Sequence, residues 1–383
     1  MRKNWSRRRL LPVVALALVL LLSQLVCAAE FPRGLHLSWQ NDPATTMTLM
    51  WRSAPGATGV VEYGKSPGEL TQTVESTTHS YRYARTEVYW HTAEITDLEP
   101  NTTYYYRVKT SEPWVSEEYA FKTGLPQGDT TPFKVGVISD SHGHGANLSK
   151  VFAMLKEEQV DFILGLGDFT DTGNQAEWED WFAASEGWLS EMPFMAVHGN
   201  HEGNQNTYWE QFAFPGNERW FSIDYGTAHF VFLMAASEPL AIEQLPWIEE
   251  DLQQNTSIWT IAMGHIPVYS SGTNHGSSPY LIKHWADVFA AYGVDFYLSG
   301  HNHMYERSHP IKDNQLDDAG VIYMTMGPVG DKYYEAVDEW WTAKTAENVS
   351  MFMVLSFEET QIAGVAKTLD GALIDEFVLE RDF

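Results

Sequence analysis

The sequence predicts a multi-domain protein, an N-terminal all-β sandwich followed by an α/β layered domain with two mixed sheets flanked by helices. Between residues 31 and 123, short runs of alternating polar and apolar residues are separated by turn residues, which is typical of a β-sandwich. Beyond a linker at residues 124–131, apolar runs alternate with segments of helical spacing, as in α/β domains. The 383 residues, 44% of them hydrophobic, suffice for roughly two domains.

The first 28 residues are typical of a removable export signal. Arg7, Arg8 and Arg9 precede an apolar run over residues 10–26, and small residues follow it, which is the order of a signal peptide. The arginines also resemble a twin-arginine signal, which carries folded proteins across bacterial membranes. We therefore expect a signal peptide at residues 1–28 and an exported protein, periplasmic or extracellular, with no stable membrane span after its removal. The alternative is an N-terminal membrane anchor, although the run is shorter than the roughly 20 residues of a spanning helix.

The chain carries a large excess of acidic residues, 51 against 24 Lys and Arg. Five of the basic residues and none of the acidic ones lie in the first 28 positions, so removal of that segment would leave 19 basic residues and a net charge of −32. Such a surface repels phosphate backbones and anionic lipids. We therefore expect no duplex nucleic acid or membrane surface as a partner, and an anionic substrate would need local positive charge, such as a bound metal ion.

The single cysteine, Cys27, lies at the end of the expected signal peptide. The mature protein would therefore have neither disulfides nor thiolate chemistry. Any metal site must then use His, Asp, Glu or Asn side chains.

The N-terminal domain, expected over residues 30–123, carries no pattern that suggests catalysis. The clearest alternating runs predict strands at residues 46–51, 59–64 and 103–108. The stretch at residues 98–108 begins Leu-Glu-Pro and resembles the fibronectin type III strand that follows a Leu-x-Pro turn. Its histidines are scattered, so we expect structural or surface roles for His36, His79 and His91.

The second domain, expected over residues 132–383, combines buried strands with amphipathic helices. Near-continuous apolar runs predict buried strands at residues 134–139, 161–166, 193–197, 229–234, 259–263 and 294–298. Helical spacing of apolar residues predicts helices at residues 147–159, 175–189, 241–254 and 281–291. From residue 321 the chain returns to strand-like alternation, so we expect a second sheet that closes the core.

Polar side chains follow five of the buried strands. They are His, Asp or Asn, mostly beside a glycine, in the segments Asp140-Ser141-His142, Gly167-Asp168, Gly199-Asn200-His201-Glu202, Gly264-His265 and Gly300-His301-Asn302-His303. In open α/β sheets ligands bind at the carboxyl ends of strands, and glycine lets the backbone approach a small site closely. Each motif alone is weak, but all five in order predict that these side chains converge.

Seven of these side chains form the candidate ligand set, which has two carboxylates, one amide oxygen and four imidazoles, with no sulfur. This set suits two first-row metal ions such as Fe, Zn or Mn, and is too rich in nitrogen for calcium or magnesium. Two metal ions about 3.5–4 Å apart can hold a bridging hydroxide and clamp phosphoryl oxygens. We therefore expect a metal-dependent hydrolase acting on a small phosphorylated substrate.

The five motifs and their order resemble those of the metallophosphoesterase superfamily, whose catalytic domains are calcineurin-like. With a sandwich in front, the chain is similar to the purple acid phosphatase family over residues 30–383. The resemblance implies phosphate monoester hydrolysis by a metal-bridged hydroxide, with Asp168 bridging both metal ions. It implies that the other ligands are Asp140, His142 and His303 at the first site, and Asn200, His265 and His301 at the second. It also implies three catalytic roles: His201 as the general acid, Glu202 as the residue that holds its ring, and His275 as a substrate-facing histidine.

Two positions depart from the purple acid phosphatase pattern. Members carry Gly-Asp-x-x-Tyr, with the tyrosine bound to ferric iron, whereas Asp171 stands at that position here. His142 stands where that family usually has glycine and where the wider superfamily has a metal ligand. We therefore expect a colourless or pale enzyme for which divalent metal ions suffice.

Two alternatives stay open. The same ligands would serve a phosphodiesterase or nucleotide pyrophosphatase, because loops outside the metal site select the substrate, and the candidate loops are residues 270–279 and 333–341. A non-catalytic binding or adhesion protein is an alternative of another class, but all seven ligand positions are retained. The sequence predicts neither the metal pair nor the oligomeric state.

Overall fold

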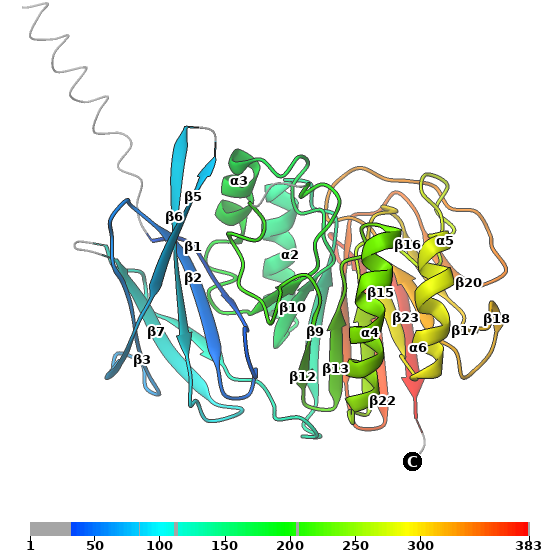
Figure 1. Cartoon of the computed structure of the whole chain (residues 1–383), viewed down its shortest axis with the longest axis horizontal. Coiled ribbons are helices and arrows are strands. Elements are labelled where there is room, and N and C mark those ends of the chain that lie inside the picture. The colour runs from blue at the N-terminus through cyan, green and yellow to red at the C-terminus, as the bar shows by residue number, and fades with distance from the viewer. Residues whose placement is uncertain (1–31, 84, 111–113, 204–206, 382–383) are drawn as a thin grey trace, which may run out of the picture.

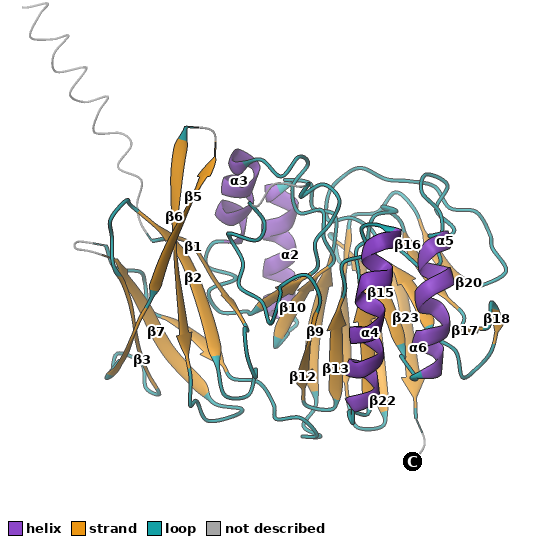
Figure 2. Ribbon diagram, viewed as in Figure 1, coloured by secondary structure: helices purple, strands orange, loops and turns teal. Residues whose placement is uncertain are grey.

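The computed structural model describes residues 32–83, 85–110, 114–203 and 207–381, so the expected signal peptide at residues 1–28 lies outside the described residues. An all-β domain, blue to cyan in Figure 1, precedes an α/β domain with mixed sheets (Figures 1 and 2). The predicted fold class is therefore confirmed. Within the described ranges, no helix has the length and apolar character needed to cross a membrane.

The N-terminal domain consists of two four-stranded antiparallel sheets, ordered β1-β2-β6-β5 and β4-β3-β7-β8. Side chains alternate between the interior and the surface, as in β7, where Tyr104, Tyr106 and Val108 are buried. The strands are β1 (Arg33–Ser38), β2 (Met47–Ser53), β3 (Gly59–Gly64), β4 (Gln72–Glu75), β5 (Thr77–Tyr83), β6 (Thr86–Ile95), β7 (Thr103–Thr110) and β8 (Tyr119–Lys122).

The first sheet of the α/β domain has the order β11-β10-β9-β21-β22-β23. Its strands β9, β10 and β11 are parallel, and the three that follow are antiparallel. Every residue of β10 and β11 is buried, which explains their continuous apolar sequence. The strands are β9 (Phe133–Ile138), β10 (Phe162–Gly165), β11 (Phe194–Ala196), β21 (Met351–Phe357), β22 (Gln361–Thr368) and β23 (Leu373–Glu380).

The second sheet has the order β12-β13-β14-β15-β19-β16-β20. Its central strands β13, β14, β15 and β19 are parallel, and the outer strands are antiparallel to their neighbours. The strands, with the separate hairpin β17-β18, are β12 (Phe221–Tyr225), β13 (Ala228–Phe232), β14 (Trp259–Met263), β15 (Phe296–Ser299), β16 (Tyr305–Ser308), β17 (Ile311–Lys312), β18 (Gln315–Leu316), β19 (Ile322–Thr325) and β20 (Thr342–Ala346).

The two sheets of the α/β domain pack against each other, with helices on their outer faces (Figure 2). Phe230 on β13 contacts Phe357 on β21, with ring centroids 5.6 Å apart. The helix α2 lies close against β9, because a Cβ atom at Gly136 would meet the Leu155 side chain. The helices are α2 (Gly145–Glu157), α3 (Gln175–Ser185), α4 (Glu238–Gln254), α5 (Pro279–Leu281), the π-helical turn η1 (Ile282–Ala286) and α6 (Asp287–Ala291).

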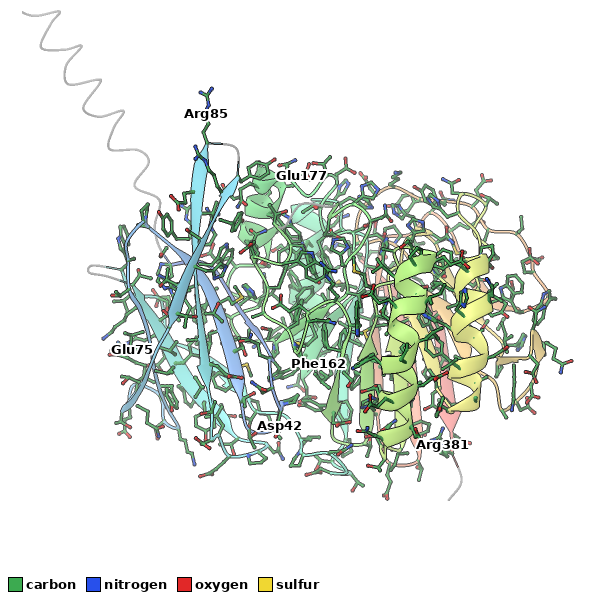
Figure 3. The ribbon with its side chains drawn as sticks, viewed as in Figure 1. Asp42, Glu75, Arg85, Phe162, Glu177 and Arg381 are labelled. Atoms are coloured by element: carbon green, nitrogen blue, oxygen red, sulfur yellow. The ribbon has the colours of Figure 1, made fainter. Side chains whose placement is uncertain are left out.

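The β-sandwich packs directly on the α/β domain. Phe162 of β10, labelled in Figure 3, contacts the ring of Trp39 with centroids 5.4 Å apart. The N–H of Leu37 donates to the Leu189 carbonyl at 2.9 Å, and the hydroxyl of Tyr106 donates to the Ser190 carbonyl at 2.7 Å. The sandwich therefore holds the segment that follows α3 by hydrogen bonds.

Candidate metal centre

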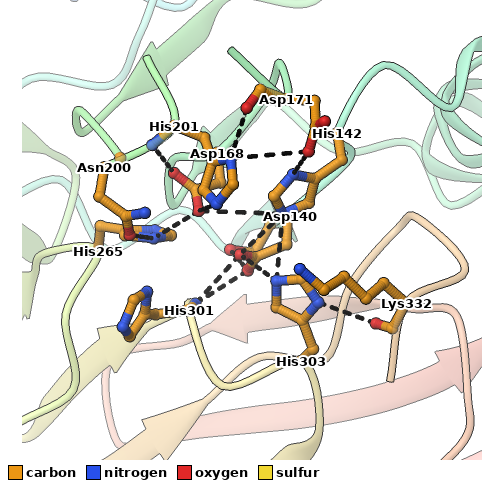
Figure 4. A network of polar contacts seen from close by, with 12 residues as sticks. Asp140, His142, Asp168, Asp171, Asn200, His201, His265, His301, His303 and Lys332 are labelled. Carbon is orange, nitrogen blue, oxygen red and sulfur yellow. Dashed lines mark hydrogen bonds and ion pairs between the residues drawn. The ribbon is translucent and has the colours of Figure 1, made fainter. Parts of the chain in front are cut away.

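The five predicted segments meet at the carboxyl ends of β9, β10, β11, β14 and β15 (Figure 4). Their ligand atoms form three clusters, each with its atoms within 4.8 Å of one another: Asp140, His142 and His303; His142, Asp168 and His201; and Asp168, His265 and His301. Asp168 belongs to two of these clusters, and Asn200 lies beside the last, with its Oδ1 atom 3.1 Å from Nε2 of His265. The structure thus brings together all seven side chains for which the sequence suggested metal binding.

The backbone is strained at five of the seven side chains. Their φ angles lie between 43° and 70°, in the left-handed region, at Asp140, His142, Asp168, His301 and His303. A residue with a Cβ atom pays roughly 1–2 kcal/mol for this conformation. Such strain persists where the surrounding structure holds it, and it clusters at functional sites.

Glycines let the segments approach one another. A Cβ atom at Gly300 would overlap the Ser139 hydroxyl and the Asp140 carboxylate, and one at Gly199 would overlap the backbone nitrogen of Asp168. Only glycine can therefore occupy these two positions without moving the neighbouring segment.

In the first cluster, two imidazoles and a carboxylate point toward one another. Nδ1 of His303 donates to the Lys332 carbonyl at 2.9 Å, so its Nε2 atom faces inward, 3.2 Å from Oδ1 of Asp140. Nε2 of His142 lies 3.1 Å from Nε2 of His303. Two imidazole nitrogens this close, beside a carboxylate, are stabilised by a positive charge between them.

The second cluster has the same construction. Nδ1 of His265 donates to the Leu166 carbonyl at 2.7 Å, which directs its Nε2 atom toward Oδ2 of Asp168 at 3.0 Å. The ring of His301 lies edge-on to that of His265, with centroids 5.1 Å apart. A backbone carbonyl that fixes the outer nitrogen is the usual support of a metal-binding histidine.

The electrostatics of the centre favour a cation. Burial alone would lower the pKa of His265, but the Asp168 carboxylate outweighs it and raises this pKa to about 10. Burial and the positive charge of His265 lower the pKa of His301 to about 3. Burial opposes ionisation of Asp140, yet the surrounding histidines hold its pKa well below its usual value. A buried site that stabilises positive charge this strongly suits a metal ion.

The residues present fit a pair of first-row metal ions. All donors are oxygen or nitrogen, and Asp168 and the His303 and His265 imidazoles are positioned by hydrogen bonds to backbone groups. This chemistry suits Fe, Zn or Mn. A binuclear centre agrees with the grouping of the side chains around the shared Asp168.

His201 lies at the solvent-facing side of the centre and is 31% exposed. Its Nδ1 atom donates to the Asp171 carbonyl at 2.6 Å, and its Nε2 atom lies 4.0 Å from Oδ2 of Asp168. The Asp171 carboxylate lies 3.3 Å from Nδ1 of His142 and 3.6 Å from Nδ1 of His201. The Asp171 carboxylate therefore lies next to the Nδ1 atoms of both imidazoles, on the side away from Asp168 (Figure 4).

The expected contact between Glu202 and the His201 ring is wrong. The Glu202 carboxylate is buried and accepts hydrogen bonds from the backbone N–H groups of Gly199, Asp168, Phe169 and Thr170 at 2.7–3.2 Å. Burial and the nearby Asp168 charge raise the pKa of Glu202 to about 7. Glu202 thus joins two of the metal-centre segments, because four N–H groups attract its carboxylate more strongly than one exposed imidazole does.

His275 lies at the rim of the centre, with its ring centroid 4.1 Å from that of His301. Two neighbours lie on the same rim: Tyr334, which belongs to the candidate loop at residues 333–341, and Lys332, which sequence reasoning missed. The Tyr334 ring stacks on the His303 ring at 4.6 Å, and the Lys332 ammonium lies 5.6 Å from the Tyr334 ring centroid. For Lys332 the local signal was the Gly-Pro-Val-Gly turn before it, after a strand-like run.

Known proteins resemble this chain in sequence and in fold. Residues 32–123 match the family described as purple acid phosphatase, N-terminal domain, and residues 133–305 match the calcineurin-like phosphoesterase family. The chain is 27% identical to acid phosphatase type 7 of Mus musculus over 404 residues, which cover 91% of each protein. It is 28% identical to purple acid phosphatase 23 of Arabidopsis thaliana, over 80% of this chain and 79% of that protein. A solved purple acid phosphatase from yellow lupin (Lupinus luteus) seeds shares the fold, with a TM-score of 0.81 and 22% identity over 92% of this chain and 75% of that one.

Proposed function

This chain is a purple acid phosphatase-like metallophosphoesterase, a metal-dependent phosphoric ester hydrolase, and on that premise we propose that it hydrolyses phosphate monoesters at the centre around Asp168. The observation that carries the proposal is the position of Asp168 between two His-containing clusters, with His201 on the open side. In this proposal Asp168 would contribute to the binding of both metal ions. The other ligands are Asp140, His142 and His303 for one ion, and Asn200, His265 and His301 for the other.

Bound metal ions would supply Lewis acidity, which lowers the pKa of water and neutralises charge on the phosphoryl oxygens. The residues of the chain supply orientation and proton transfer. His201 keeps its Nδ1 proton on the Asp171 carbonyl, so its Nε2 atom is the one that faces the reacting group. In the imidazolium form, Nε2 donates its proton to the leaving oxygen of the ester. The Asp171 carboxylate lies 3.6 Å from the same Nδ1 atom.

We propose further that residues 1–28 export the protein, by a twin-arginine or general secretory route, and are then removed. The mature chain would comprise a fibronectin type III-like sandwich at residues 30–123, a linker at residues 124–131 and the catalytic domain at residues 132–383. The order of basic, apolar and small residues in the first segment supports export.

The test compares substrates and metal content on one preparation. The chain from residue 29 onward, loaded with Fe, Zn or Mn, is assayed with a monoester, a diester and a nucleoside polyphosphate, and bound metal is quantified. We expect the monoester to be hydrolysed and about two metal ions per chain to be bound. Asp168→Ala should abolish both properties, while Asp318→Ala, at an exposed carboxylate outside both candidate loops, should change neither. Monoester activity that survives in Asp168→Ala, or hydrolysis of the diester alone, would overturn the proposal.

A further inference from the structure

Lys332 places an unpaired positive charge beside the metal centre of a strongly acidic chain. The side chain extends along His303 toward Asp140 in Figure 4. Among the described residues, no carboxylate forms an ion pair with its ammonium group. The adjacent Asp331 is directed elsewhere, since its carboxylate lies 3.1 Å from Nε2 of His144. The net charge of the chain is −27, so a cation left free at this position is available to an anionic ligand.

The backbone around Lys332 is fixed to the centre on both sides. Before it, the N–H of Gly330 donates to the Asp140 carbonyl at 3.1 Å. At Lys332 itself, the carbonyl accepts from Nδ1 of His303 at 2.9 Å. After it, the N–H of Tyr334 donates to the His303 carbonyl at 3.3 Å. The same two residues that contribute to the first cluster therefore hold the base of the lysine side chain.

Tyr334 and His275 lie next to Lys332, and these three residues form one wall of the metal centre. The Lys332 ammonium lies 5.6 Å from the Tyr334 ring centroid, and the Tyr334 ring lies 5.5 Å from that of His275. The wall thus presents a cation, an aromatic ring and an imidazole next to both clusters.

Two loops beside this wall are joined by backbone hydrogen bonds. The N–H of Thr273 donates to the Glu335 carbonyl at 2.8 Å, and the N–H of Val337 donates to the Ser271 carbonyl at 3.0 Å. Gly272 and Ala336 form an antiparallel bridge between them. The loop at residues 270–279 and the stretch at residues 333–341 therefore act as a single structural unit.

Building on the proposed function, we propose that Lys332, with Tyr334 and His275, forms a subsite for a second phosphoryl group, so that the preferred substrates are phosphoric anhydrides, whose leaving group is itself a phosphate or a phosphate ester. Inorganic diphosphate and nucleoside diphosphates have this chemistry. With the terminal phosphoryl group at the metal centre, the adjoining one lies toward the wall. Water forms the new bond to the terminal phosphorus and loses a proton to solvent as the bridging P–O bond breaks. The leaving oxygen takes the proton from Nε2 of His201.

The subsite is tested by binding, which needs no turnover. Methylenediphosphonate and inorganic phosphate are titrated calorimetrically into the metal-loaded mature chain and into three variants. We expect Lys332→Gln to weaken methylenediphosphonate binding by roughly 10–100-fold relative to phosphate, the range for a lost charged hydrogen bond. Lys332→Arg should retain most of the affinity. Lys344→Gln, at an exposed lysine on β20, is the matched control and should behave as the wild type.

Kinetics provide the second measurement. The ratio of kcat/KM for diphosphate to that for p-nitrophenyl phosphate should fall at least about tenfold in Lys332→Gln. An unchanged ratio and unchanged relative affinity, or an equal loss in Lys344→Gln, would overturn the subsite. A wild-type enzyme that hydrolyses no monoester would instead overturn the proposed function, while the binding ratio would still decide the role of Lys332.

Discussion

The Glu202 carboxylate accepts a hydrogen bond of 2.9 Å from the backbone N–H of Asp168. The same Oε2 atom accepts from the N–H of Gly199 at 2.8 Å, so one buried side chain joins the turn after β10 to the turn after β11. Both turns carry side chains of the metal centre, Asp168 and Asn200. Glu202 is therefore a positioning residue that fixes the separation of two proposed ligands.

We predict that Glu202→Gln weakens metal binding and lowers the melting temperature. The amide keeps the size of the side chain but places an NH2 group against backbone N–H groups, which costs about 1–3 kcal/mol for each buried donor left unsatisfied. Glu177 is the matched control, because its carboxylate also accepts from two backbone N–H groups, at Asp171 and Thr172, but outside the buried centre. Metal titration and thermal unfolding of both variants check this. Full metal occupancy at an unchanged melting temperature in Glu202→Gln would refute the positioning role.

The second prediction concerns His201. Replacement by Ala should lower turnover by roughly 10²–10⁴, the usual contribution of general acid catalysis, and leave metal content nearly unchanged. The loss should be smaller for a nitrophenyl ester than for an alkyl ester, since a good leaving group needs less protonation. Rates for both esters in wild type and variant give the comparison. Equal slowing of the two would show that His201 is not the proton donor.

The proposed ligands could be predicted because each carries a local signal. Asp168, Asn200 and His265 each follow a glycine at the end of a short apolar run, and such runs identify buried parallel strands. Strand ends on adjoining strands lie at one edge, so convergence follows from the pattern alone.

Other features of the site depend on contacts that no local pattern encodes. The family resemblance implies that Glu202 holds the His201 ring, whereas the actual partners of Glu202 include residues more than thirty positions away. Lys332 follows an unremarkable turn, and its place beside His303 results from hydrogen bonds between distant segments. The helix predicted at residues 281–291 likewise contains the π-helical turn η1, which apolar spacing does not reveal.

The third prediction concerns stability and His229, which is outside the metal centre. Its Nδ1 atom lies 2.8 Å from the Asp224 carboxylate and its Nε2 atom 2.9 Å from that of Asp251. Burial alone would lower the pKa of His229, but the two carboxylates raise it from 6.5 to about 9. A raised pKa in the folded state stabilises the protein fully below about pH 6.5, and this stabilisation is lost as the pH rises through 9.

The change should amount to roughly 2–3 kcal/mol of unfolding free energy between pH 6 and pH 10. His229→Gln should be less stable than wild type at pH 6, and the difference should shrink at pH 10. Urea unfolding at both pH values, with His309→Gln as an exposed control, measures it. A difference between wild type and His229→Gln that stays constant with pH would contradict the charged histidine.

The last prediction concerns colour and pH optimum. The Asp171 carboxylate stands where the purple enzymes carry a tyrosine, and it lies behind His142, 3.3 Å from Nδ1. The hydroxyls of Tyr269 and Tyr305 are bonded to Asn314 at 3.2 Å and to Asp375 at 2.8 Å, so neither is directed at the centre. Without a tyrosinate donor, the iron-loaded enzyme should show no purple charge-transfer band.

A neutral imidazole from His142 in place of a tyrosinate also removes one hard anionic ligand, which weakens the preference for a trivalent ion. Divalent ions should then support full activity, and because they acidify water less than ferric iron does, the optimum should lie near neutral pH or above. Visible spectra of the iron-loaded enzyme and pH–rate profiles with Zn and Mn check both points. A purple band together with an optimum below about pH 5 would contradict the argument. Tyr334, whose ring stacks on His303, would then be the tyrosine to replace with Phe, because it is the one in contact with a proposed ligand.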